Sequence, residues 1–195
     1  MPFYRNITLV LLMPLALLLP SVAAAQQGSL DVEAAYQAIP HKRTVFVKDG
    51  LKMPASDADS MMQYFKLLDE GIVLRVTAFT KIAKKQNIDR EIQLYEKLLA
   101  DFASLEKKFP KNFVTLTRDA VREQRDFYST WLKDLGSSRF PAASRNLQDR
   151  MNDAPINSSS QKLIAAYGKV METYPQESDK TKEAFFDYHC ALDFK

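Results

Sequence analysis

Apolar residues recur every three or four positions along most of the chain beyond residue 55, which is the spacing of one face of an α-helix. We expect five helices, over residues 56–86, 89–109, 110–135, 157–174 and 178–194. Prolines fall between these segments, where they interrupt no helical hydrogen bond. The pattern predicts an all-α fold, an antiparallel helix bundle of four or five long helices. A less regular helical array is the alternative.

The middle of the third helix, residues 118–126, is dense with charge. It offers the core little beyond Ala120 and Val121. We interpret this stretch as a solvated, ion-paired face; a partly buried polar layer is the alternative.

The last helix is apolar over much of its circumference. One side carries Phe185, Tyr188 and Leu192, and the next carries Phe186, Cys190 and Phe194. Because a helix of this kind is usually buried between others, we expect it to dock into the core with Cys190 as a buried, inert thiol. A reactive thiol and an intermolecular bridge are the alternatives for the only cysteine of the chain.

A different piece, residues 26–55, precedes the bundle and forms one domain with residues 56–195. A short helix is expected over Leu30–Ile39, where Pro40 ends it. Residues 44–47 have strand composition, and Asp49-Gly50 is a turn signal. The sequence therefore predicts a short N-terminal extended or hairpin segment.

Residues 1–25 have the three parts of a cleavable signal peptide. Arg5 supplies a positive charge, residues 7–19 are mostly apolar, and Ala23 and Ala25 satisfy the small-x-small cleavage rule before Gln26. The apolar stretch is shorter than the about 20 residues that a membrane-spanning helix needs. We expect an exported protein, periplasmic or secreted and bacterial, with no transmembrane segment after cleavage.

Composition and motifs exclude several classes of function. Lys and Arg number 27 against 24 Asp and Glu, which gives no support for a nucleic-acid partner. The chain lacks a glycine-rich phosphate loop, Gly-x-Ser-x-Gly, His-Glu-x-x-His and the paired Glu-x-x-His of di-iron bundles. A hydrolytic or redox enzyme is therefore the least favoured hypothesis.

A basic cluster, His41-Lys42-Arg43, follows the first short helix. Its cations could hold a carboxylate or phosphate group, with Arg43 as a bidentate donor. The favoured interpretation is that these cations are solvated and placed near a helix C-terminus.

A metal site is the second candidate, because imidazole and thiolate both suit zinc or copper. His189 and Cys190 are adjacent on a helix and point about 100° apart, so they do not readily chelate one ion. A site would need His41 to approach one of them. A hydrogen-bonded core histidine is the favoured interpretation of His189, and no cofactor is predicted.

The sequence leaves two main hypotheses about function. The first is an exported, non-catalytic domain that binds a protein partner or an envelope component. The second is a small-ligand or metal-binding bundle that uses His41, His189 or Cys190.

Overall fold

The computed structural model describes residue 48 and residues 50–84, 86–135 and 154–193. These residues form an all-α structure, as the periodicity predicts. The helices are α2 (Ala55–Ala83), α3 (Asp89–Lys108), α4 (Asn112–Leu135), α7 (Ala154–Thr173) and α8 (Asp179–Leu192). Within this part of the chain, no helix combines the length and the apolar character needed to cross a membrane.

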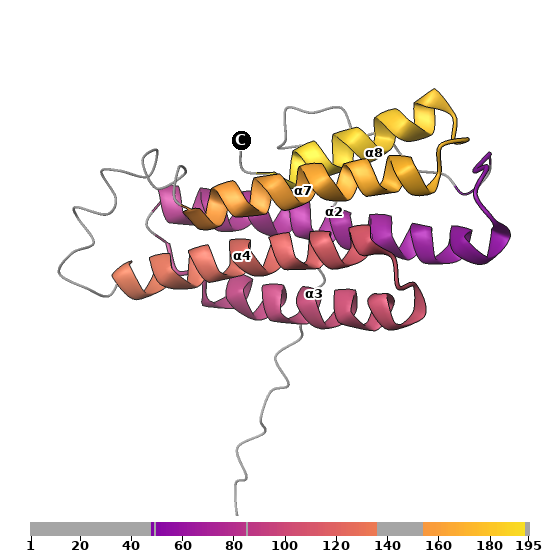
Figure 1. Cartoon of the computed structure of the whole chain (residues 1–195). Coiled ribbons are helices and arrows are strands. Elements are labelled where there is room, and N and C mark those ends of the chain that lie inside the picture. Colours follow the sequence, from indigo (N-terminus) through magenta and orange to yellow (C-terminus); the bar gives the residue numbers. More distant parts are fainter. Residues whose placement is uncertain (1–47, 49, 85, 136–153, 194–195) are drawn as a thin grey trace, which may run out of the picture.

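The helices lie side by side and close into a ring (Figure 1). Each packs against the next along the chain, from α2 through α3, α4 and α7 to α8, and α8 then packs back against α2. The apolar core lies inside this ring. Because α8 contacts α2 as well as α7, the last helix completes the fold.

The helix α3 shows most plainly why the sequence folds as it does. Its apolar stripe, Tyr95, Leu98, Phe102 and Leu105, is buried, as its spacing predicts. Asp89 and Glu91 lie in its first turn and Lys107 and Lys108 in its last, where each sign of charge is favoured by the helix dipole.

One end of the bundle is tied together by polar contacts. The backbone N–H of Lys52 donates to Glu177 Oε1 at 2.9 Å, and Tyr174 Oη donates to Asp57 Oδ2 at 2.8 Å. Lys111, in the turn between α3 and α4, lies 3.3 Å from the same carboxylate. Gly50 has φ of +95° in the turn before α2, as the Asp-Gly signal predicts. The short helix and strand expected within residues 26–47 lie outside the described residues.

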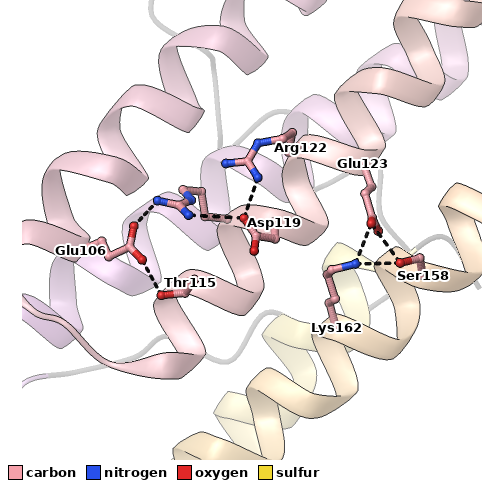
Figure 2. Close-up of polar contacts among 8 residues, drawn as sticks. Glu106, Thr115, Asp119, Arg122, Glu123, Ser158 and Lys162 are labelled. Carbon is pink, nitrogen blue, oxygen red and sulfur yellow. Dashed lines mark hydrogen bonds and ion pairs between the residues drawn. The ribbon is translucent and has the colours of Figure 1, made fainter.

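The charged middle of α4, residues 118–126, is ion-paired as the sequence predicts, but it is only partly exposed to solvent. Its side chains are ion-paired; Arg122 and Asp119 pair within α4, but other pairs bridge neighbouring helices and are partly buried (Figure 2). Arg118 binds Glu106 of α3, and Lys162 of α7 lies 2.6 Å from Glu123. The side chains of these four residues are 21–29% exposed. The expectation of a solvated face holds for Arg122 and Asp126, which are exposed. It is wrong for Arg118 and Glu123, because α4 lies between α3 and α7 and has flanking helices on two sides.

The expectation that α8 is buried on both of its apolar sides is also wrong. Phe185, Tyr188 and Leu192 are buried, but Phe186 is 51% exposed and Cys190 is exposed. The physical reason is that α8 packs mainly against α2 and α7, which cover one side of it, so only one of its faces meets the core.

The C-terminal end of α8 is held by side chains from two other helices. Arg75 Nε donates to Ala191 O at 3.0 Å, and Gln124 Nε2 donates to Leu192 O at 2.8 Å. These contacts satisfy carbonyl groups that the end of a helix leaves without a partner. Leu192 packs so closely on Gly71 that a Cβ atom there would lie 2.9 Å from Leu192 Cδ1.

Two helix glycines should therefore respond in opposite ways to alanine. A Cβ atom at Gly168 meets no heavy atom of the described residues within 4 Å, so Gly168→Ala should raise the free energy of unfolding by about 1 kcal/mol. Gly71→Ala should lower it by about 1 kcal/mol, because Leu192 must move in a packed core. Urea unfolding of both variants measures the difference. Equal stabilisation by the two would show that Leu192 is not held in place.

Candidate functional site

The structure describes only two of the five candidate site residues that the sequence suggests, and these two differ in burial. His41, Lys42 and Arg43 lie outside the described residues, so the anion site and the approach of His41 to α8 stay predictions. His189 and Cys190 both lie in α8 and face different surroundings. His189 is buried, 3% exposed, whereas Cys190 is exposed.

His189 is the end of a buried hydrogen-bond chain. Its Nδ1 lies 2.6 Å from Phe185 O, which can only accept, so Nδ1 carries the proton and donates. Nε2 then accepts from the Tyr64 hydroxyl at 2.8 Å. The Tyr64 oxygen in turn accepts from the Thr117 hydroxyl at 2.7 Å. We call Tyr64, Thr117 and His189 the polar hub; it joins α2, α4 and α8.

The polar hub confirms the interpretation of His189 as a hydrogen-bonded core histidine. Burial lowers the pKa of His189 to about 4, although the hydrogen bond to Phe185 opposes the shift. The ring is therefore neutral at neutral pH, and both of its nitrogens are occupied. As a metal ligand or a general base it would first have to give up one of these bonds.

Cys190 contradicts the expectation of a buried thiol. It follows His189 by one residue and therefore points about 100° away from it, toward the outside of α8. Partial burial, together with Asp193 and Asp187, raises the pKa of the thiol. The side chain is thus accessible but predominantly protonated at neutral pH. Among the described residues, no group of three or more His, Cys, Asp or Glu is arranged to hold a metal ion.

The most distinctive surface is formed by α7 and α8. Among residues 50–82, 86–130 and 157–193, apart from the gap at 131–156, the large apolar side chains that are exposed are Ile164, 68% exposed, and Phe186, 51% exposed. One lies on each of these two helices. The Phe186 ring packs edge-on against Tyr167, with ring centroids 5.6 Å apart.

The register of the two helices places these side chains together. Ser160 Oγ donates to Asp193 Oδ1 at 2.5 Å, and Tyr167 contacts Phe186. Ile164 lies between Ser160 and Tyr167 on α7, so it is level with Cys190 on the antiparallel α8. We call the outer surface of Ile164, Gly168, Phe186 and Cys190 the α7–α8 face.

Sequence reasoning missed the polar hub and half of this face. Tyr64 and Thr117 lie beside the apolar stripes of their helices, and no local spacing relates them to a residue more than 70 positions away. The exposure of Ile164 could have been predicted from the sequence, because this residue falls outside the inward-facing stripe of Leu163, Tyr167 and Val170.

The polar hub predicts acid-sensitive stability. The unfolded chain binds a proton at His189 near pH 6.5, whereas the folded chain resists protonation until about pH 4. Stability is therefore complete above about pH 6.5 and falls as pH drops toward 4, by up to about 3 kcal/mol in total.

Urea unfolding at pH 4.5 to 7.5 measures this effect in the wild-type chain and in His189→Gln, which can still accept from Tyr64. Carboxylates titrate in both proteins and contribute equally to the dependence of the unfolding free energy on pH. The variant should therefore lose only the part of that pH dependence that His189 contributes. His41→Gln, at the other histidine of the chain, is the matched control and should keep the full pH dependence of the wild-type chain. An unchanged slope in His189→Gln would overturn the assignment.

Comparison with known proteins finds no matching family model, no matching curated sequence and no matching solved structure. The function therefore has to be inferred from the residues and geometry of this chain.

Proposed function

We propose that this chain is an exported, non-catalytic binding domain of the periplasm or cell envelope. Its α7–α8 face docks a protein partner that presents apolar side chains. The observation that carries the proposal is that Ile164 and Phe186, both large, apolar and exposed, lie about one helical turn apart on the neighbouring helices α7 and α8, because single exposed apolar residues are ordinary and grouped large ones mark interaction sites.

The energetics suit docking. Full burial of a Phe or Ile side chain contributes about 1.5–3 kcal/mol, so two such anchors supply a useful part of a micromolar affinity. Phe186 is supported from the side by Tyr167, and its helix is fixed by the polar hub and by Arg75. A rigid anchor loses little conformational entropy on binding.

The alternative, a small-ligand or metal site, gains no support from the described residues. His189 uses both ring nitrogens within the fold, and Cys190 points to the outside. Such a site would have to depend on His41, outside the described residues.

Export makes a prediction of its own. Because residues 23–25 satisfy the cleavage rule, protein recovered from the envelope fraction of its own cells should begin at Gln26. N-terminal sequencing or intact-mass measurement decides this. Ala23→Leu/Ala25→Leu should block cleavage, while Ala24→Leu, at the unconstrained position, serves as the control. A chain that retains Met1 and stays in the cytoplasm would contradict the export proposal.

Docking predicts that the two apolar anchors are needed for binding and not for folding. A protein captured from envelope extract by the wild-type chain should be identified, purified and titrated against each variant. Ile164→Ser/Phe186→Ser should bind it at least tenfold more weakly while the chain still folds cooperatively with only a small drop in unfolding midpoint, because both side chains are more than half exposed. Ser104→Ala/Lys108→Ala, at exposed positions on α3, is the matched control. Equal affinity of all three proteins would overturn the docking proposal.

A further inference from the structure

His189 lies in surroundings that suit only its neutral form. Its Nε2 accepts from the Tyr64 hydroxyl, so a second proton on the ring turns this nitrogen from an acceptor into a donor. The hydrogen-bond chain can reverse, because the Tyr64 hydroxyl can donate to Thr117 instead of accepting from it. The hydrogen bonds therefore survive protonation, and the cost lies in the positive charge itself. A charge in the core is tolerated only where a partner neutralises it.

The helices packed around His189 supply no such partner within the described part of the chain. The titratable side chains that face its ring are the phenols of Tyr64 on α2 and Tyr167 on α7, with ring centroids 6.0 and 6.2 Å away. The helix α4 contributes the neutral hydroxyl of Thr117, bonded to Tyr64. Arg75 of α2, which binds the end of α8, is itself a cation. None of these groups can neutralise an imidazolium ion.

The carboxylates on α8 itself do not neutralise His189 either. Asp187 and Asp193 raise the pKa of the Cys190 thiol, on the outer side of the helix. At His189, burial lowers the pKa and the hydrogen bond to Phe185 opposes the shift, and no carboxylate of the described residues contributes. A protonated His189 is therefore stabilised only by reaching water.

The helix α8 can open without unpacking the other helices. It is the last helix of the ring and packs mainly against α2 and α7. The contacts of α2 with α3, of α3 with α4 and of α4 with α7 do not involve it. Movement of α8 therefore brings His189 to water while these contacts are kept. It also uncovers Phe65 on α2, which packs against Phe185 and Tyr188 of α8.

We propose that α8 opens as a local unit in acid. Uptake of a proton at His189 releases α8 from α2 and α7, while α2, α3, α4 and α7 stay packed on one another. Acid thus opens one helix before it unfolds the chain. The release depends on the core contacts of α8 and not on any docking partner.

Hydrogen exchange of the full chain, followed by mass spectrometry and corrected for intrinsic rates, tests this local opening. At each pH from 4.5 to 7.5, the α8 amides should be protected at least tenfold less than the slowest amides of α3. Because the open form binds one more proton, α8 protection should also fall at least tenfold between pH 6.5 and 4.5. Most of this fall should disappear in His189→Gln, and all of it should remain in His41→Gln.

A core variant away from α8 separates the local opening from unfolding of the whole chain. Ile88 is buried where α3 begins. Ile88→Val should lower the protection of the slowest α3 amides by roughly twofold to tenfold, because it removes a buried methyl group. The protection of α8 should stay unchanged, since α3 keeps its packing when α8 opens.

Two kinds of result would overturn the proposal. Equal protection of α8 and α3 at each pH, or an equal fall of both in Ile88→Val, would show that α8 opens only when the whole chain unfolds. A pH dependence of α8 protection that is absent from the wild-type chain, or that is unchanged in His189→Gln, would remove His189 as the group that takes up the proton. If His189→Gln does not fold, the wild-type chain and Ile88→Val still decide between local opening and global unfolding.

Discussion

The attachment of α8 decides what this protein presents to its surroundings. The helix closes the ring by packing between α2 and α7, and three separate contacts fix it. His189 bonds to Tyr64 inside the core, and Arg75 and Gln124 bind its last carbonyl groups. Because these contacts come from different directions, α8 can neither slide along its axis nor rotate about it without breaking at least one.

Rotation is the motion that matters most. Phe185 and Phe186 are adjacent and chemically identical, so apolar packing alone offers little preference for burying one over the other. A turn of about 100° would exchange them. His189 removes this ambiguity. It reaches the Tyr64 hydroxyl only in the orientation of α8 that buries Phe185. A fully satisfied buried polar network of this kind selects one arrangement of the core among several.

The sequence predicts the all-α class and most helix boundaries because these follow from local spacing. The stripe of α3 from Tyr95 to Leu105 is an example in which periodicity alone identifies the buried face. The orientation of α8 could not be predicted in this way, because both of its sides are apolar. It depends on Tyr64, far away in the sequence, and on the number of helices that pack around α8.

The same reasoning explains the charged residues of α4. Their composition predicts ion pairs, and ion pairs are found, but exposure depends on what lies beside the helix. Glu123 pairs with Lys162 because α7 lies next to α4, and Arg118 reaches Glu106 because α3 lies on the other side. A tertiary arrangement, and not a local pattern, thus determines whether a charged stretch meets solvent or another helix.

The anchoring of α8 also separates the two roles of its neighbouring residues. His189 has a structural role: it is buried, its ring is neutral at neutral pH, and both of its ring nitrogens form hydrogen bonds within the protein. By holding the helix in one rotation, it turns Phe186 and Cys190 outward beside Ile164. His189 therefore acts by fixing the orientation of α8, and the surface that this orientation exposes is the one that we propose binds a partner.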